Sequence, residues 1–310
     1  MSFSIENNTV DVQAVNQAFF DLLDRGMDKQ AAESGNRLIR TVVRQEANVR
    51  SLFNVVPVGA GDLDQHPTSD QPMKYLDIEP NSEASTVQFY ATPEAESYTL
   101  SRVPGFFQLV QSKEFYKSKF ELMTNRNDVR QILAENSTKD VGDQEDIAWR
   151  RAALLHVKRN PTVQRSSFAS LNPTAWKSAM QAVVDRRLPV GKGLLSESRY
   201  MDMIDQPATV VGESIARRHY EEGIKNEKGL LGLPVVTSVK TDIYLKDEAW
   251  IVPPEEFMGA FWTLQDATLY VEQKGPMIRF YIYESVCIVL ARGNAIQQII
   301  FNGQPNGGLV

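Results

Sequence analysis

The sequence is poor in the residues that build disulfide-linked, metal-binding or membrane-spanning proteins. Its single cysteine, Cys287, excludes an intrachain disulfide and is typical of a reducing compartment. The three histidines, His66, His156 and His219, form neither an HxxxH nor an HExxH pair, so they lack metal-ligand spacing. No stretch approaches the ~18 consecutive apolar residues of a membrane-spanning helix. The N-terminal residues lack the charged and apolar regions of a secretory signal, so we expect synthesis inside the cell without export.

The sequence also has no excess of positive charge. It carries 33 Lys and Arg against 39 Asp and Glu, a formal net charge of −6. Proteins that bind nucleic acid tightly over their whole surface are usually basic, so the composition argues against binding of that kind. What is present is ordinary for a globular protein, with 42% hydrophobic residues. A chain of 310 residues can bury a substantial core, as one large domain or two smaller ones.

Two segments come close to catalytic motifs but do not complete them. Residues 189–193, PVGKG, lack the first glycine and the final Ser or Thr of a P-loop, and they follow a predicted helix instead of a strand. Residues 212–216, GESIA, differ by one residue from a GxSxG nucleophile elbow, and His219 is close by. An elbow needs a preceding strand and a histidine late in the chain, whereas Pro207 lies just upstream. Ser214 is therefore predicted to be a surface serine, and a serine hydrolase is the alternative.

The remaining reactive side chains are assigned structural roles. Four acidic residues cluster between 140 and 146, and we expect them at helix N-termini, where carboxylates favour the helix dipole, and not in a paired-carboxylate site. They are Asp140, Asp143, Glu145 and Asp146. Cys287 follows Val286 and precedes Ile288 and Val289, which predicts a buried, inert thiol. The sequence therefore predicts no catalytic residue, no cofactor and no metal site.

Helical spacing of apolar residues opens the chain. The first predicted helix begins near Val12 and stops at Gly26; its apolar positions are Val12, Val15, Phe19, Leu22 and Leu23. The second carries one stripe formed by Leu38, Val42, Val49 and Phe53. Another face of that helix bears Arg37, Arg40 and Arg44. These arginines are interpreted as a solvated face, with contact to an acidic neighbour or to DNA as the alternative.

A polar hairpin is predicted in the next part of the chain. Residues 55–72 are rich in Gly, Pro and Asp and predict a connecting loop. Residues 73–122 hold many β-branched and aromatic residues with a turn at 92–94, which predicts two long strands folded back on each other. A two-stranded ribbon is marginal alone in water. Because this ribbon is also unusually polar, we expect it to be ordered by contact with a neighbouring molecule.

Further helices and a strand-rich end complete the pattern. Helices are predicted from 128 to 160 with a break around Gly142, from 173 after the N-cap Asn172, and over 213–222. Strands are predicted in the segments VVTSV, AWIVP, ATLYVE, IRFYIYES and VCIVLA, and the last residues, GQPNGGLV, are predicted to be a loose tail. Helices mixed with mainly antiparallel strands, without regular alternation, indicate an α+β fold.

Several segments of the last third resemble one known family. Residues 229–236, GLLGLPVV, look like the Leu-Gly-x-Pro-Val segment of tailed-bacteriophage coat proteins of the Hong Kong 97-type fold. Residues 250–254, WIVPP, and 257–261, FMGAF, resemble the segment in which such coats run a strand out of the axial domain. The preceding order of helical arm, long polar hairpin and helix after Phe120 also matches, so the resemblance covers most of residues 30–303.

The resemblance implies a division of the chain into the parts of that fold. It places a helical arm at 1–55, the peripheral-domain entry and extended hairpin loop at 56–123, and a spine helix at 124–160. It places the axial domain at 161–261, peripheral-domain strands at 262–283, and a return to the axial domain with the C-terminal tail at 284–310. Gly142 departs from the family pattern, because the family's spine helix is usually continuous.

The resemblance also implies a structural role. It suggests a major capsid protein that self-assembles as hexamers and pentamers into the icosahedral head shell around phage DNA, built in the host cytoplasm and found in the virion. Portal, scaffolding and decoration proteins would be partners, contact with packaged DNA would be weak and non-specific, and no membrane would be involved. An encapsulin-like compartment shell is the alternative within the same fold. Some coats of the family weld subunits through a hairpin lysine, but no lysine occurs from Tyr75 to Ser112, which predicts non-covalent assembly.

Overall fold

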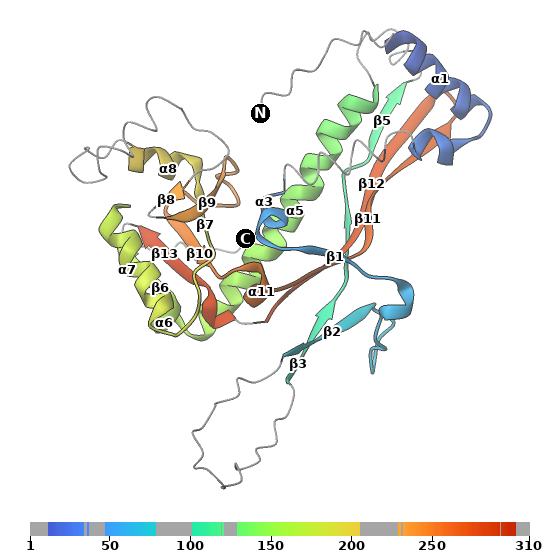
Figure 1. Ribbon diagram of the computed structural model, residues 1–310. Helices are drawn as coiled ribbons and strands as arrows, with labels where there is room; N and C mark the ends of the chain where they lie inside the picture. The colour runs from blue at the N-terminus through green and yellow to red at the C-terminus, as the bar shows by residue number, and fades with distance from the viewer. Residues whose placement is uncertain are drawn as a thin grey trace, which may run out of the picture.

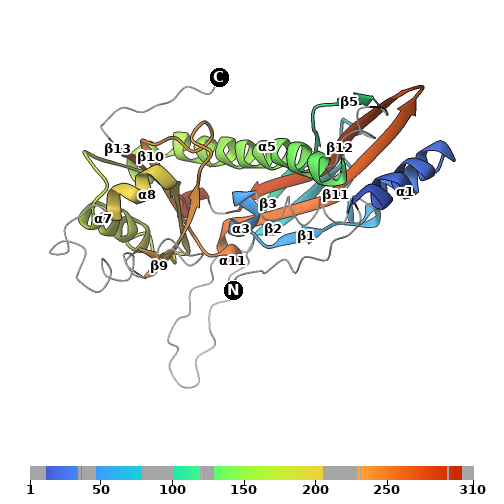
Figure 2. The same cartoon turned by 90° about the horizontal axis from the view of Figure 1, so that it is seen from above.

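Two β-sheets joined by one long helix form the framework of the molecule. The computed structural model describes residues 12–33, 36, 47–78, 101–118, 120, 129–204, 229–230, 232–291 and 293–301. Helix α5 (Val129–Arg159) runs alongside both sheets, as Figures 1 and 2 show. The mixture of helices and mainly antiparallel strands confirms the α+β prediction. In the described part of the chain, no helix combines the length and the apolar character that crossing a membrane requires.

The first sheet, here called the long sheet, is built on one extended hairpin. Strand β11 (Gly259–Lys274) pairs antiparallel with β12 (Met277–Leu290) through a turn at Gly275. Strand β1 (Val55–Pro57) lies parallel to β11, while β4 (Gln108–Gln111) and β5 (Phe115–Ser118) pair with β12. The predicted strands 278–285 and 286–291 are therefore one strand. Glu284 and Ser285, at the junction of the two predicted strands, are both buried within β12.

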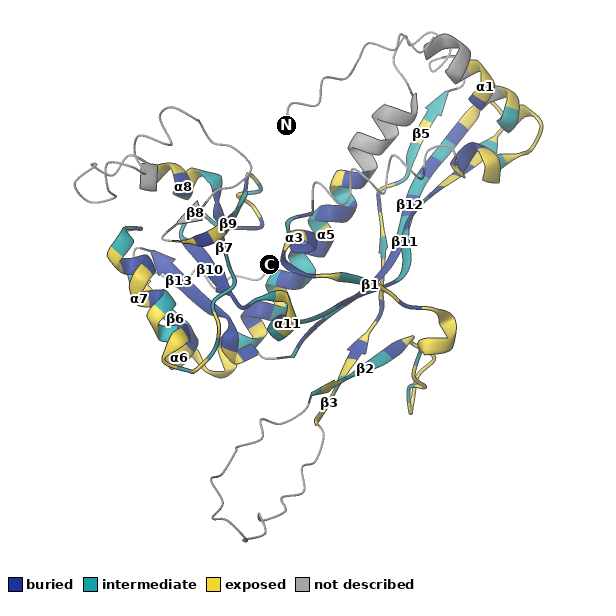
Figure 3. Ribbon diagram, viewed as in Figure 1, coloured by how far each residue is buried: buried dark blue, intermediate teal, exposed yellow. Residues whose placement is uncertain are grey.

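The second sheet has six strands in the order β6-β13-β10-β7-β9-β8. The strands are β6 (Arg165–Phe168), β7 (Lys192–Ser196), β8 (Gly229–Leu230), β9 (Leu233–Ser238), β10 (Glu248–Val252) and β13 (Gln297–Phe301). The sequence predicted β9 and β10 but missed β6, β7 and β13. Strands β10 and β13 are buried along their whole length, as Figure 3 shows.

Helices cover both faces of this six-stranded sheet. Helix α7 (Pro173–Val184) packs Trp176, Ala179 and Val183 against one face, next to α8 (Glu197–Ile204). The other face packs against Trp149 and its neighbours on α5. The predicted cap of α7 is confirmed, because the Asn172 side chain accepts a hydrogen bond from the Ala175 nitrogen at 2.7 Å. Short turns of helix complete this unit: α6 (Pro161–Gln164), α11 (Glu255–Met258) and η2 (Gly293–Ala295).

Helix α5 is continuous over 31 residues, so the predicted break at Gly142 is wrong. A glycine inside a helix costs about 1 kcal/mol relative to alanine. That cost is small beside the burial of Val141, Trp149, Ala153 and Val157, each fully shielded from solvent. A Cβ at position 142 would lie 3.5 Å from the Cβ of Ala47, so the glycine faces the start of the neighbouring helix. Tertiary packing outweighs the local preference.

The N-terminal helices differ from the prediction at one point. Helix α1 (Val12–Asp24) forms as expected and buries Phe19 and Leu23 against the long sheet. The expected second helix does not run unbroken to Phe53, because Ala47 has an extended backbone and a new helix, α3 (Asn48–Leu52), begins after it. The residues expected to carry the arginine row, Arg37, Arg40 and Arg44, lie outside the described residues.

The base of the predicted hairpin is confirmed and its second strand is shorter than expected. Strands β2 (Met73–Ile78) and β3 (Ser101–Phe106) pair antiparallel and project from the long sheet in Figure 1. Residues 79–100 lie outside the described residues. Beyond Phe106 the chain leaves the ribbon and enters the long sheet as β4 and β5, so residues 108–118 do not continue the hairpin. The predicted loop 55–72 contains β1 and the short helix η1 (Ala60–Asp62).

The hairpin base packs closely on one face of the long sheet. A Cβ at Gly105 would lie 2.4 Å from Cγ2 of Val289 and 2.7 Å from Sγ of Cys287, so only glycine allows β3 to approach so closely. Phe107, Trp262 and Cys287 form the apolar cluster beneath it. Helices α1 and α5 pack on the opposite face, because Phe280 and Ile282 share a cluster with Phe19 and Val141. The hairpin base and α5 therefore lie on opposite faces of the long sheet.

Candidate functional site

A buried cluster of charged side chains joins the helices to the long sheet. At its centre, the Arg50 guanidinium of α3 is 3% exposed. Its nitrogens donate to both carboxylate oxygens of Glu145 on α5, at 2.7 and 2.9 Å. The same group donates to Oε2 of Glu284 on β12 at 2.7 Å and to Oδ1 of Asp266 on β11 at 3.4 Å. One cation thereby contacts three elements that lie far apart in the sequence.

The protonation states of this cluster follow from its burial. Desolvation raises the pKa of Glu284 to about 10, and the neighbouring Glu145 carboxylate adds to the rise against the opposing charge of Arg50. Burial alone would lower the pKa of Arg50, but the hydrogen bond and charge of Glu145 hold it above its ordinary value. At neutral pH the cluster therefore holds a charged Arg50 and a protonated Glu284. Its two fully buried acids do not carry two charges.

A second ion cluster involves the residues of α5 on either side of Glu145. The Lys240 ammonium, in the turn after β9, pairs with Asp143 and Asp146 of α5, each at 2.8 Å. Asp146 also accepts from the backbone nitrogen of Val49 at 3.0 Å, and the Asn48 amide donates to it at 3.3 Å. Burial raises the pKa of Asp146, and the charge of Lys240 opposes that rise. Asp146 thus accepts from one of the free N–H groups in the first turn of α3, that of Val49, and links that helix to α5.

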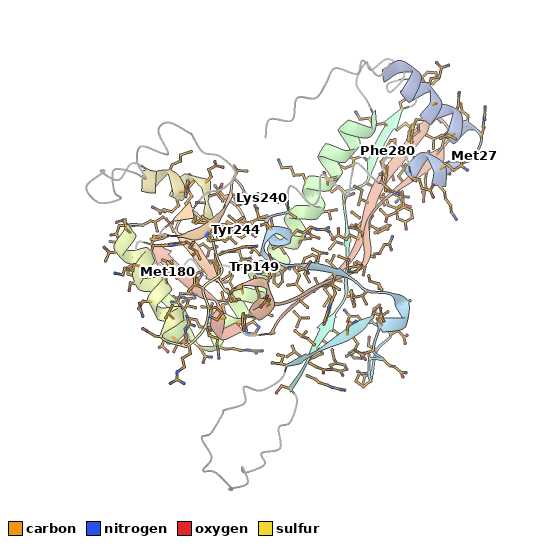
Figure 4. The ribbon with its side chains drawn as sticks, in the orientation of Figure 1. Met27, Trp149, Met180, Lys240, Tyr244 and Phe280 are labelled. Atoms are coloured by element: carbon orange, nitrogen blue, oxygen red, sulfur yellow. The ribbon has the colours of Figure 1, made fainter. Side chains whose placement is uncertain are left out.

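These contacts overturn the prediction for the acidic cluster. Asp143, Glu145 and Asp146 lie in the middle of α5 and not at a helix N-terminus. Glu145 and Asp146 are fully buried, and each is occupied by a cation from another element. Tyr244 packs beside Trp149 of α5, with the two ring centroids 6.2 Å apart, and both residues are labelled in Figure 4. The spacing of the acidic residues along one helix gave no indication of cation partners 94 and 95 residues away in the sequence.

A surface pocket of about 470 Å³ opens at the edge of the Arg50 cluster. It is lined by α3 and the start of the long sheet, with Arg50 and Asp266 at its polar side and Phe53, Val55 and Leu264 at its apolar side. Arg50 already contacts three acidic side chains, so it is not free to bind an anion. Among the described residues, no group of three His, Cys, Asp or Glu side chains has a metal-binding arrangement.

The other candidate residues from the sequence analysis, where the structure describes them, pack against or bond to neighbouring residues of the fold. Cys287 is buried as predicted, and burial raises the pKa of its thiol to about 12, which disfavours the reactive thiolate. Lys192 of the PVGKG segment donates to the Ser51 carbonyl and pairs with Glu255 at 2.7 Å. His156 is half-buried against Gly293, and His66 packs on the Phe106 ring. Ser214 and His219 lie outside the described residues.

Comparison with known proteins identifies the fold through structure alone. No protein-family model and no curated protein matches the sequence. The solved structure of Mycobacterium phage Bobi matches with a TM-score of 0.60 at 14% identity, over 84% of this chain and 91% of that chain. A virus-like particle from Pyrococcus furiosus matches with a TM-score of 0.58 at 14% identity, over 86% of this chain and 98% of that chain.

A third match is the capsid structure of cyanophage P-SCSP1u, with a TM-score of 0.56 at 13% identity over 82% of this chain and 87% of that chain. The chain therefore has the fold of phage capsid proteins, the Hong Kong 97-type fold that the sequence resemblance predicted. At such low identity the shared arrangement of sheets and helices carries the likeness.

The protonated state of Glu284 makes a testable prediction about stability. Its folded pKa of about 10 lies above the ordinary value of 4.5, so this group's contribution is full below pH 4.5 and is lost as pH rises toward 10. A glutamine at this position would copy the protonated acid without titrating. We expect Glu284→Gln to gain stability relative to wild type between pH 6 and pH 9, measured by urea unfolding at about these two values.

Glu256→Gln is the matched control, because Glu256 is exposed on α11. That variant should follow the wild-type pH dependence. An equal difference between Glu284→Gln and wild type at both pH values would show that Glu284 is ionised throughout and would contradict the assignment.

Proposed function

We propose that this chain is the major capsid protein of a tailed bacteriophage, which assembles as hexamers and pentamers into the icosahedral head shell around DNA. The observation that carries the proposal is the match to capsid and particle structures over most of both chains. Assembly would take place in the host cytoplasm, and portal, scaffolding and decoration proteins would be further partners. The proposed role needs no catalytic residue, cofactor or metal.

The two sheets support a division into the two domains of a coat subunit. We assign the axial domain to the six-stranded sheet with α6, α7 and α8, and the peripheral domain to the long sheet with α5 as its spine helix. Strands β11 and β12 run across the boundaries expected at 261 and 283. We therefore place the domain junctions at Gly259 and Leu290, where these strands begin and end.

The hairpin supports assembly through contact between different surfaces of neighbouring copies. Its base is fixed to the long sheet through Gly105 and Phe107. From Tyr75 to Ser112 the sequence carries five acidic residues and one basic residue, a net charge of −4. A rigidly rooted, polar ribbon suits a heterologous contact, in which one surface meets a different surface of the next copy.

A compartment shell of the encapsulin type is the second candidate. The observation that favours it is the virus-like particle from Pyrococcus furiosus, which the chain matches over 98% of that protein's length. The nucleic-acid content of particles isolated from the native source separates the two proposals. Heads filled with genome-length DNA support the coat protein, and particles that enclose protein instead support the compartment.

Assembly and the hairpin can be tested together. Purified wild-type protein, with its scaffold if one is needed, should form closed shells in electron micrographs. Deleting 81–98 leaves all the described pairs of β2 and β3 in place. We expect that variant to keep its circular dichroism spectrum and melting temperature within a few degrees, but to build no stable shell.

Two results would contradict these expectations. Wild-type protein that stays monomeric at high concentration with scaffold present would contradict the capsid proposal. A deletion variant that unfolds as a monomer would show that the hairpin belongs to the subunit core.

The absence of a hairpin lysine predicts a shell held by non-covalent contacts only. An isopeptide bond needs the amine that the span Tyr75–Ser112 lacks. Wild-type shells boiled in denaturing detergent under reducing conditions should therefore run as monomers on a gel. A ladder of covalent multimers would overturn this prediction, and Lys113 and Lys117 would then be the first positions to substitute.

A further inference from the structure

Positive charge is concentrated in one part of this acidic chain. Residues 147–199 contain ten Lys and Arg but only two acidic residues, a net charge of +8, whereas the whole chain carries −6. Several of these cations form ion pairs within the subunit. Arg150 pairs with Glu248, Lys192 with Glu255, and Arg199 with Asp247. The others include a set that faces solvent.

Four exposed cations form what we call the basic ridge: Arg151, Lys158 and Arg159 on α5, and Arg187 just after α7. In the described part of the chain, none of the four has a carboxylate partner. Positions 151 and 158 lie on one stripe of the helix. Leu155, which lies between them on that stripe, is 57% exposed. From Arg151 to Arg159 the row extends about 12 Å along the helix axis.

The ends of α5 and α7 that carry the ridge are joined by direct contacts. Arg186, next to Arg187, donates to the Asn294 carbonyl of η2. The Asn160 amide, just after α5, donates to the Asn294 side chain at 3.5 Å, and His156 packs against Gly293. The acidic residue closest to Arg187 in the sequence is Asp185, which accepts a hydrogen bond from the Gln181 side chain. Arg186 and Asn160, the neighbours of Arg187 and Arg159, thus both contact Asn294, which places Arg187 near the C-terminal end of the row on α5.

Compensation of the helix dipole explains only part of this arrangement. Lys158 and Arg159 lie in the last turn of α5, where cations stabilise a helix. Arg151 lies two turns earlier, beyond the reach of that effect, yet it stands on the same exposed stripe. A row of unpaired cations on a rigid helix fits an extended polyanion outside the subunit.

The faces of the long sheet distinguish between the two polyanions available to a shell. The acidic hairpin is rooted on the face that carries Trp262 and Cys287, and α5 packs on the opposite face. Because copies in a closed shell share one orientation, the hairpins lie on one side of the wall and α5 on the other. Figure 2 shows α5 along one edge of the molecule, across both sheets.

We propose that the basic ridge contacts the phosphate backbone of the duplex DNA enclosed by the shell. This inference rests on the proposed function and assigns the α5 side of the subunit to the interior of the particle. The contact is independent of base sequence, since it comes from side-chain cations and phosphates. Four cations per subunit, repeated over a shell, would contact many phosphates of the outer layer of DNA without the whole acidic surface binding it.

The test compares two full-length variants with equal loss of charge. The ridge variant combines Arg151→Gln, Lys158→Gln, Arg159→Gln and Arg187→Gln. The control variant combines Lys29→Gln, Lys113→Gln, Lys246→Gln and Lys274→Gln, all exposed and outside the ridge. Binding of a random-sequence DNA duplex is measured by fluorescence anisotropy over a series of salt concentrations, and thermal melting and electron microscopy of shells are recorded for the same proteins.

The ridge variant should melt and assemble like wild type but bind DNA about tenfold or more weakly at about 0.1 M salt. Its slope of log affinity against log salt should fall by ~0.9 for each phosphate that the variant no longer neutralises, and the control should change less than about threefold. Equal weakening of both variants, or wild-type binding by the ridge variant, would overturn the proposal. So would a ridge variant that binds DNA normally yet builds no shell, because the ridge would then be a subunit contact. Failure of wild-type protein to form shells is seen separately and contradicts the proposed function itself.

Discussion

The buried guanidinium of Arg50 is the contact on which the arrangement of this subunit depends. A charge removed from water is tolerated only when it is paired and hydrogen-bonded, and breaking such a pair costs about 3–5 kcal/mol. Arg50 therefore constrains α3, α5 and β12 to positions in which Glu145 and Glu284 reach it together. The proton held by Glu284 follows from the same constraint, because one cation cannot stabilise two fully buried carboxylates and the partly exposed Asp266 as well.

The positions of both sheets depend on the Arg50 cluster. Helix α5 packs against the six-stranded sheet through Trp149, whose ring lies edge-on to that of Trp250 with the centroids 5.7 Å apart. Strand β12 carries the long sheet, whose opposite face holds the base of the hairpin through Gly105. The hairpin base and α5, which carries three of the four cations of the basic ridge, therefore lie on opposite faces of the long sheet. Two chemically different faces suit the proposed shell wall, whose inner and outer surfaces would meet different partners.

Local sequence patterns predicted the helices and strands that depend mainly on neighbouring residues. The apolar spacing around Phe19 predicted α1, and Asn172 predicted the start of α7. The β-branched and aromatic residues of β9 to β12 predicted strands in those segments. The break predicted at Gly142 was wrong because packing along α5 outweighs the preference of one residue. The roles of Glu145 and Asp146 could not be predicted, since their partners Arg50 and Lys240 are 95 and 94 residues away. The order of motifs, more than any single one, indicated the fold.

Native-state hydrogen exchange on an Arg50→Met variant tests the central role of Arg50 most directly. If the guanidinium fixes three elements together, amides of α3, of α5 between Val141 and Trp149, and of β12 between Ile282 and Cys287 should lose protection jointly, by about 3–5 kcal/mol of opening free energy. Strands β10 and β13, which the apolar core buries, should lose much less. Loss of protection confined to α3, or unchanged exchange in all three elements, would show that apolar packing alone positions them and would contradict this account.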